Sequence, residues 1–246
     1  MSMRTASGRT PAPEHDQPDP GTRGRQEMSD PTRAQGRTPA PVVTLFESYG
    51  SGAGYIGPRV AQELGVPFHP QAFSSEEIEA ATTQRENQST LSRILSAVGG
   101  SYAGLDGPSV AMAQADDHDR VLENTRVVTE QAREGGVIVG RNAALILANQ
   151  PATLHVMLDG PLRQRIERAA KDSGIDIERA AKRQKREDQV RADMSIQFYG
   201  WDPRETSRYD LVVNTGRMDL DTCVDIIVQA ARLKAARAGA PRPDRG

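Results

Sequence analysis

One stretch constrains the fold of this 246-residue chain more than any other, the run PVVTLFESYGSGAGYIGPRVAQELG over residues 41–65. Its apolar start predicts a strand over 42–47, which runs into the glycine-dense turn GSGAG at 50–54. Apolar residues at helical spacing then predict a helix over 56–64. Glycines let backbone N–H groups approach an anion closely, and a helix N-terminus adds unpaired donors and partial positive charge. This stretch therefore predicts a phosphate-binding loop.

Three interpretations of the glycine turn compete. A strict P-loop, GxxxxGK[ST], fails because Ala53 stands at the lysine position and Gly54 at the Ser/Thr position. The pattern GxGxxG is satisfied by Gly52, Gly54 and Gly57, but a dinucleotide fold also wants an acidic residue closing the second strand. An ordinary tight turn would bind nothing. We favour phosphate binding, because a strand and a helix flank the turn in the required order.

Short apolar runs alternate with helical patterns along the rest of the chain. Strands are predicted over residues 42–47, 66–69, 136–140, 153–159 and 210–214, and helices over 117–133 and 220–233. Three of the strands are nearly continuous in Val, Ile and Leu, which is typical of parallel strands buried on both faces. The pattern predicts a three-layer α/β fold with a five-stranded parallel sheet and a ligand at the carboxyl ends of the strands.

Composition narrows the classes of function. The formal net charge of −2 gives no argument for binding nucleic acid or an anionic membrane, and no apolar run approaches the length of a bilayer span. The single cysteine, Cys223, excludes an intramolecular disulfide and fits a reducing cytoplasm. Residues 1–40 and 235–246 are polar and rich in Pro, Gly and Arg, so both are expected to be disordered tails. The oligomeric state is not indicated.

Two segments have the character of insertions. Residues 72–115 begin with a polar helical pattern over 74–97, and residues 161–200 are dense in arginine and lysine. A run of charges on a helix is usually a solvated face, with nearby acids as partners. Beside a phosphate loop, the same cations also suit a mobile helical lid whose guanidinium groups close over phosphates.

Other candidate residues stand where predicted strands end. Arg141 follows the run GVIVG and should point into the ligand crevice. Asp159 closes the fourth strand as a helix cap or, less favoured, a metal-side acid. Asn214 and Thr215 close the last strand, where they contact a purine base or form an ordinary turn. Trp201, like its neighbour Tyr199, is interpreted as a packing residue.

Four pieces in order resemble the cytidylate-kinase-like group of P-loop nucleotide kinases over about residues 42–232. These pieces are TLFESYGSGAGYIGPRVAQELGVPF, GGVIVGRNAALIL, LHVMLDGPLRQRIERA, and KREDQVRAD followed by GWDPRETSRYDLVVNT. The resemblance implies an adenylate-kinase-like domain over 41–234, with an acceptor-binding insert at 72–115 and an arginine lid at 175–200. It also implies ATP with Mg²⁺ as the phosphoryl donor and a nucleoside monophosphate, CMP-like, or another small acceptor.

The resemblance assigns roles to particular residues. Loop residues whose backbone would bind the donor phosphates are Gly50, Ser51, Gly52, Ala53, Gly54 and Tyr55, and Asn214 with Thr215 would lie at the donor base. Residues of the transfer site are Arg141 for the acceptor phosphate, Arg183, Arg186 and Arg191 from the lid, and Asp188. No metal-ligating side chains are assigned.

The loop departs from the family pattern in its charge. Family loops commonly carry an arginine before and another within the glycine turn, whereas this chain has Glu47 and Gly54 there. Tyr55 replaces an acidic residue, and Pro70 stands where an acid often follows the second strand. The loop has lost two cations and gained an anion. A catalytically impaired pseudokinase, which binds nucleotide as a sensor or partner-binding module, is therefore the alternative hypothesis.

Overall fold

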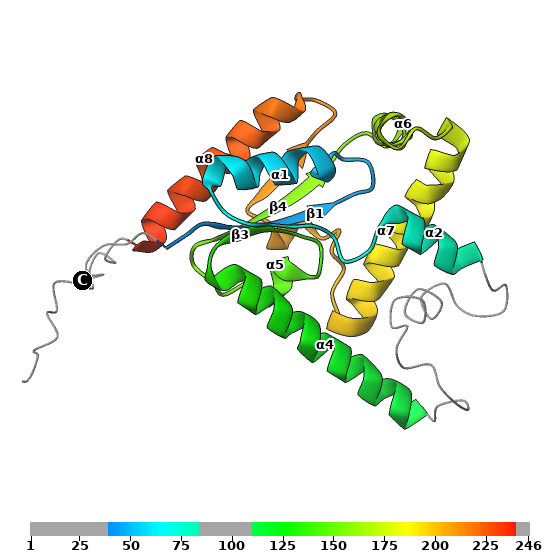
Figure 1. Ribbon diagram of the computed structural model, residues 1–246, viewed down its shortest axis with the longest axis horizontal. Helices are drawn as coiled ribbons and strands as arrows, with labels where there is room; N and C mark the ends of the chain where they lie inside the picture. The colour runs from blue at the N-terminus through cyan, green and yellow to red at the C-terminus, as the bar shows by residue number, and fades with distance from the viewer. Residues whose placement is uncertain (1–38, 84–109, 240–246) are drawn as a thin grey trace, which may run out of the picture. The chain divides into compact units, whose positions relative to one another are not determined.

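The computed structural model describes residues 39–83 and 110–239 (Figure 1). Its strands are β1 (Val42–Glu47), β2 (Phe68–His69), β3 (Gly136–Val139), β4 (Thr153–Asp159) and β5 (Leu211–Asn214). Its helices are α1 (Ala53–Leu64), α2 (Ser75–Thr83), α4 (Val110–Arg133), α5 (Ala143–Ile146), α6 (Leu162–Ser173), α7 (Ile177–Tyr199), the 3₁₀ turn η2 (Thr206–Arg208) and α8 (Leu220–Gly239).

The strands form one parallel sheet in the order β2-β3-β1-β4-β5, which confirms the predicted five-stranded sheet. β1 lies at the centre, where Val42 pairs with Gly136 of β3 and with Thr153 of β4. The continuous apolar strands are buried on both faces, as the pattern predicted, because helices cover both sides. β5 is an edge strand, and its Val212 is exposed.

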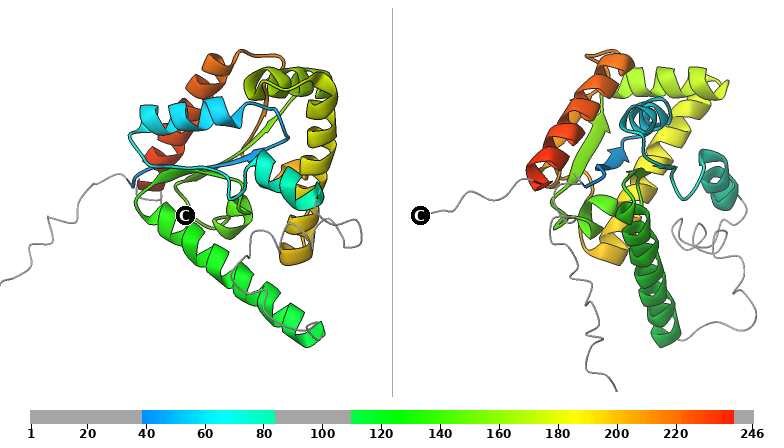
Figure 2. Two further views of the ribbon diagram at one scale, coloured as in Figure 1. Left: turned by 45° about the vertical axis from the view of Figure 1, so that its right-hand side comes forward. Right: turned by 60° about the vertical axis from the view of Figure 1, so that its left-hand side comes forward.

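Helices pack on both faces of the sheet and create the three predicted layers (Figure 1). On one face, α1 and α8 bury Ile56 and Ile227 against the strands in the larger apolar cluster. On the other face, α4 and α5 bury Val128 and Ala143 against Val42 and Ile138. α6 and α7 lie at the end of the sheet where β1 runs into its glycine turn, and α2 packs beside α7 (Figure 2).

Element boundaries differ from the predictions in instructive ways. α4 begins at Val110, seven residues before the predicted start at 117, inside the segment expected to be an acceptor insert. Most of that insert, residues 84–109, lies outside the described residues, as do residues 1–38 and 240–246. α8 continues to Gly239, past the predicted helix end at 233, so residues 235–239 are helical rather than part of a disordered tail. Ala235 is buried four residues after buried Ala231, so small side chains extend the apolar stripe.

The predicted lid is one long helix preceded by a tight corner. Gly174 ends α6 in the left-handed conformation with φ 63°, which glycine adopts without steric cost. Asp176 then caps α7, where its carboxylate accepts a hydrogen bond from the Arg179 backbone N–H at 2.8 Å. This corner sends α7 along the carboxyl-end side of the sheet, so its side chains face the glycine loop.

Candidate functional site

The glycine loop has the tight conformation that its composition predicts. Gly50 and Gly52 have φ values of 79° and 94°, a region that other residues adopt only with strain. A Cβ at Gly50 would overlap the backbone carbonyl of Arg165 in α6. Gly50 therefore permits both the turn and the close approach of α6 to it.

Replacing Gly50 with alanine is expected to destabilise the fold by about 3 kcal/mol, because left-handed strain adds to an overlap with backbone that cannot move aside cheaply. Chemical denaturation of both proteins measures the difference. Gly54→Ala is the matched control, since a Cβ there meets no atom within 4 Å and its position is helical. It should leave the unfolding free energy unchanged or slightly higher. Equal losses from both substitutions would contradict this account.

The amide groups of the loop divide into two sets. Within the described chain, the backbone N–H groups of Gly50, Gly52 and Gly54 have no hydrogen-bond acceptor. The N–H groups of Ser51 and Tyr55 donate to carbonyl oxygens within the turn, each at 3.0 Å. The unpaired amides lie at the carboxyl end of β1 and the start of α1. They can accept an anion such as a phosphate group.

An acidic side chain already occupies part of this anion site. The Glu47 carboxylate accepts a hydrogen bond from the Ala53 backbone N–H at 3.2 Å, at the first position of α1. Burial raises the pKa of Glu47, an effect that Arg191, with its nitrogen 3.7 Å from the carboxylate, opposes. A carboxylate at a helix start imitates a bound anion. Glu47 therefore occupies a backbone amide at the start of α1 that an external anion could otherwise contact.

Two arginines of the basic stretch, which received no individual role from the sequence, support the loop from α6. Arg165, which is 8% exposed, donates to the Tyr49 carbonyl at 2.9 Å and to Asp188 at 3.1 Å. Arg168 donates to the Gly50 carbonyl at 2.9 Å. Their spacing of three residues, which places both on one helix face, was the available signal.

Asp188, assigned to the transfer site, is tied to the loop backbone. It accepts a hydrogen bond from the Tyr49 N–H at 2.7 Å as well as that from Arg165. Gln184, one turn earlier on α7, donates to the same carboxylate at 2.7 Å. Asp188 thus links α7 to the glycine turn.

Arg141 stands in a strained corner after β3. It and Asn142 are non-glycine residues with positive φ, 58° and 55°, which costs on the order of 1–3 kcal/mol at each position. Asn124 of α4 donates to the Arg141 carbonyl at 2.8 Å, and Trp201 donates to the Asn142 side chain at 3.0 Å. These contacts hold the corner, which agrees with the tendency of backbone strain to gather at functional sites.

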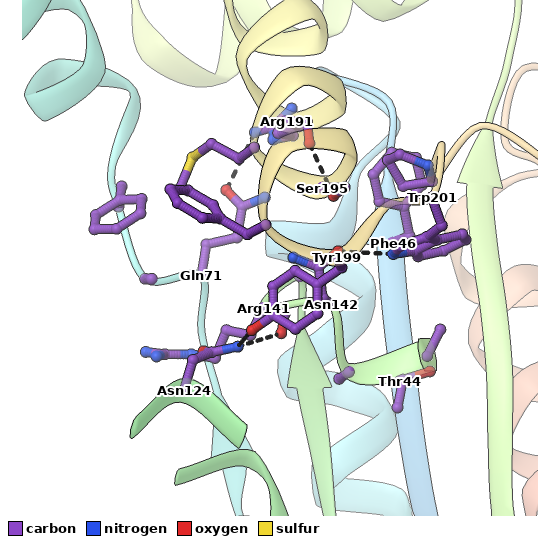
Figure 3. Close-up of a pocket in the computed structure, with 18 of the residues that line it drawn as sticks. Thr44, Phe46, Gln71, Asn124, Arg141, Asn142, Arg191, Ser195, Tyr199 and Trp201 are labelled. Atoms are coloured by element: carbon purple, nitrogen blue, oxygen red, sulfur yellow. Dashed lines mark hydrogen bonds between the residues drawn. The ribbon is translucent and has the colours of Figure 1, made fainter. Parts of the chain in front are cut away.

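A cavity of about 330 Å³ lies next to this corner, in the size range of ligand pockets. It opens between the ends of β1 and β3, with α4 on one side and α7 on the other (Figure 3). Arg141 and Arg191 both line it. So do Tyr199 and Trp201, which were interpreted as packing residues; only the fold shows that they face a cavity.

The predicted lid arginines occupy different environments. Arg183 is 3% exposed and binds two acids of α2, with nitrogens 2.9 Å from Glu76 and 2.5 Å from Glu79. Hydrogen bonds from Arg179 and Arg183 lower the pKa of Glu79 to about 2. Arg191 pairs with Glu187 at 2.8 Å.

Arg186 is half-buried and makes no ion pair within the described chain. Of the three arginines assigned to the lid, Arg186 is therefore the one without a carboxylate partner in the described chain. The lid hypothesis expects Arg183, Arg186 and Arg191 to converge on a phosphate. In this structure Arg183 and Arg191 are instead held in separate ion pairs.

Arg183→Ala is expected to lower the unfolding free energy by about 2 kcal/mol, because a buried cation and its hydrogen bonds to α2 are lost. Urea denaturation at neutral pH measures this loss. Lys182→Ala is the matched control, because Lys182 is exposed and pairs with exposed Glu178 on the same helix. It should have no measurable effect. If the urea midpoint of Arg183→Ala equals that of the wild type, the ion pairs of Arg183 with Glu76 and Glu79 do not hold α2 in place.

The remaining predicted residues have mainly structural partners. Thr215 is buried, and its hydroxyl lies 3.1 Å from both Arg168 and the Asp159 carbonyl. The Asn214 side chain accepts from the Gly216 N–H at 3.1 Å. In the described residues, no group of three acidic, histidine or cysteine side chains could hold a metal ion.

Residues 42–217 match the sequence profile of the cytidylate kinase-like family. The chain belongs to this family. Together with the observed sheet, the match confirms the predicted P-loop NTPase type of α/β fold. No helix in the described ranges has the length and apolarity needed to cross a membrane.

Three proteins are similar to this chain in sequence or in fold. A segment of 107 residues is 38% identical to uronate isomerase of Corynebacterium glutamicum, covering 44% of this chain and 21% of that protein. Cytidylate kinase of Methanopyrus kandleri is 36% identical over 136 residues, covering 52% of this chain and 70% of the kinase. The crystal structure of an uncharacterized protein from Eubacterium ventriosum has a similar fold, with a TM-score of 0.53 and 19% sequence identity. The match covers 78% of this chain and 98% of that protein.

The dinucleotide interpretation of the glycines does not fit this family member. In this sheet β3 lies between β2 and β1, so β2 is not the neighbour of β1. In the dinucleotide fold the second strand lies next to the first. β2 ends at His69 and is followed by Pro70 rather than an acid. Gly57 allows α1 to pack closely on the Phe68 ring.

Proposed function

We propose that this protein transfers the γ-phosphoryl group of ATP to a small phosphorylated acceptor, with CMP as the first candidate. The observation that carries the proposal is Arg141, a desolvated cation with no carboxylate partner in the described chain. It lies beside a cavity at the carboxyl end of β3, next to the strand that opens the glycine loop. The burial of its Nε without a hydrogen-bond partner is costly, and an anionic ligand would relieve that cost. Relatives described as cytidylate kinases support the same function.

The residues divide the work between donor and acceptor. Backbone amides of the glycine loop would bind the donor β-phosphate, and Arg141 would hold the acceptor phosphate. An acceptor oxygen attacks the γ-phosphorus while the bond to the β–γ bridging oxygen breaks and ADP leaves. Mg²⁺ bound to the ATP phosphates would neutralise part of their charge. Arg186 and Arg191 would add positive charge from α7, so catalysis rests on positioning and electrostatics.

A second candidate function is a nucleotide-binding pseudokinase. Glu47 occupying the Ala53 amide favours it, as does the commitment of Arg183 to the acids of α2. In that case ATP binds and no acceptor is phosphorylated.

One assay separates the kinase from the pseudokinase. It measures ADP release from ATP and Mg²⁺ with a panel of nucleoside monophosphates as acceptors, and ATP binding is recorded on the same sample. Turnover with one acceptor supports the kinase and names its substrate. Binding without turnover favours the pseudokinase.

Arg186→Ala tests the role of α7 in the same assay. Arg186 makes no ion pair in the described part of the chain, so its removal should spare stability. We expect its loss to lower kcat about 100-fold, because charge on the transferring group goes uncompensated. Wild-type turnover in this variant would remove Arg186 from the mechanism.

A further inference from the structure

Three consecutive residues form the backbone corner that carries Arg141. Gly140, Arg141 and Asn142 all have positive φ, at 69°, 58° and 55°. Glycine adopts this region freely, whereas the other two residues keep it only where their surroundings hold them there. The direction in which the Arg141 side chain leaves the sheet therefore depends on the contacts that fix this corner.

The Arg141 carbonyl is fixed by a side chain of another helix. Within the described chain, no backbone N–H donates to this carbonyl. It accepts instead from the Nδ2 amide of Asn124 in α4, at 2.8 Å. The carbonyls on either side, those of Gly140 and Asn142, both accept backbone N–H groups of α5. Arg141 is thus the point of the corner at which α5 gives no support and Asn124 supplies it.

The same amide group reaches the end of α7. Asn124 Nδ2 also donates to the hydroxyl of Tyr199, the last residue of α7, at 2.7 Å (Figure 3). α7 carries Arg191, which lines the cavity together with Arg141. One amide therefore connects α4, the corner that carries Arg141 and the helix that carries the second arginine of the cavity.

We propose that Asn124 is a positioning residue of the acceptor site. Its amide holds the backbone corner that aims Arg141 into the cavity, and it ties that corner to the end of α7. Asn124 acts through Arg141 rather than on the acceptor itself. The inference rests on the proposed function in one respect, that Arg141 binds the acceptor phosphate.

The first test replaces Asn124 with alanine in the full-length protein and measures initial rates over a range of acceptor concentrations. We expect kcat/KM for the acceptor to fall about 30-fold, because small displacements of a positioning group are costly in phosphoryl transfer. ATP affinity should stay unchanged, because Arg165 and Asp188 hold the glycine loop independently of α4. Unchanged ATP affinity also shows that the variant is folded. A wild-type kcat/KM would overturn the proposal.

Thr129→Ala is the matched control on the same helix. Thr129 is exposed, and its hydroxyl donates to the Thr125 carbonyl within α4 at 2.7 Å. The substitution removes a hydrogen bond from α4 without touching the corner at Arg141, so neither kcat/KM nor ATP affinity should change. A loss equal to that of Asn124→Ala would mean that any disturbance of α4 has this effect, which contradicts the proposal.

A double-mutant cycle decides whether Asn124 acts through Arg141. In the Arg141→Gln background, Asn124→Ala should lower kcat/KM by less than about 3-fold, because no guanidinium is left to aim. Equal falls in both backgrounds would mean that Asn124 contacts the acceptor itself or only supports the fold, and would overturn the proposal. Tyr199→Phe removes the hydroxyl alone and should lower kcat/KM about 5-fold. A wild-type value there would overturn the tie to α7.

A binding measurement separates failure of this inference from failure of the proposed function. Trp201 is the single tryptophan of the chain and lines the cavity, so its fluorescence reports CMP binding without any transfer. If CMP binding depends on Arg141 but no monophosphate releases ADP, the phosphoryl transfer is wrong. Weaker CMP binding to Asn124→Ala then supports the positioning role, and equal binding overturns it. If ADP is released and Asn124→Ala turns over like the wild type, the transfer stands and the positioning role is wrong. If no monophosphate binds the wild type, both are wrong.

Discussion

Replacing Glu47 with glutamine is expected to tighten ATP binding about 30-fold, which corresponds to about 2 kcal/mol. The glutamine oxygen can still accept the hydrogen bond from the Ala53 N–H, so the loop keeps its shape. The substitution removes a negative charge from the start of α1, where the unpaired amides of Gly52 and Gly54 would meet phosphate. One unit charge within several ångströms of a phosphate is worth this amount at a partly solvated site. Calorimetric titration with ATP and Mg²⁺ measures the change.

The pH dependence identifies the charge as the cause. Because burial raises the pKa of Glu47, lowering the pH toward that value neutralises the carboxyl and removes its repulsion of phosphate. The charged groups that act on it are Arg191, Asp188, Arg165 and Glu187. The affinity difference between wild type and Glu47→Gln should shrink as the pH falls, whereas titration of ATP itself affects both proteins alike.

The matched control is Glu178→Gln on the exposed face of α7, which should leave ATP affinity unchanged. A Glu47→Gln affinity equal to wild type at neutral pH would mean that Glu47 does not compete with the nucleotide.

Replacing Arg141 with glutamine is expected to lower kcat/KM for the acceptor about 1,000-fold while ATP affinity stays the same. The guanidinium is the cation at the acceptor cavity that lacks a carboxylate partner among the described residues. Its loss removes a charge-assisted contact in a desolvated site. Stability should not fall with activity, because the half-buried charge that is removed has no carboxylate partner in the described chain. Initial rates over a range of acceptor concentrations, together with a thermal melt, measure both quantities.

Arg126→Gln on α4 is the control for this substitution. Arg126 pairs with Glu123 and Glu130 on an exposed helix face, so its removal should change neither rate nor melting temperature. Equal activity of Arg141→Gln and wild type would place the acceptor elsewhere. A large fall in the melting temperature would instead show that Arg141 is structural.

The central sheet and its glycine loop could be predicted from local patterns. Continuous Val, Ile and Leu runs mark β3 and β4 as buried on both faces, and glycines at 50 and 52 mark a turn with positive φ. The last turn of α8 was missed because its segment has the composition of a tail. Burial of Ala235 depends on a neighbouring element that no local pattern reveals.

The candidate site was only partly predictable. Arg141 was found because it follows a buried strand, and the loop residues because glycines flank a helix start. The roles of Arg165 and Arg168 were not predicted because their partners, the carbonyls of Tyr49 and Gly50, lie more than a hundred residues away in sequence. Pairing of Arg183 with α2 was equally hidden, since charge patterns show which residues are cationic and not which anion each will meet.

The sequence by itself determined the parallel α/β sheet, the tight glycine turn before α1 and the arginine at the end of β3, because each follows from the order of neighbouring residues. Only the tertiary structure decided which charged side chains are paired with an opposite charge or with a backbone amide. Folding brings Glu47 to the Ala53 amide, Asp188 to Tyr49 and Arg183 to the acids of α2, and leaves Arg141 without an anion in the described chain. The physical reason is that electrostatic pairing depends on distance and burial in space, which sequence separation does not specify.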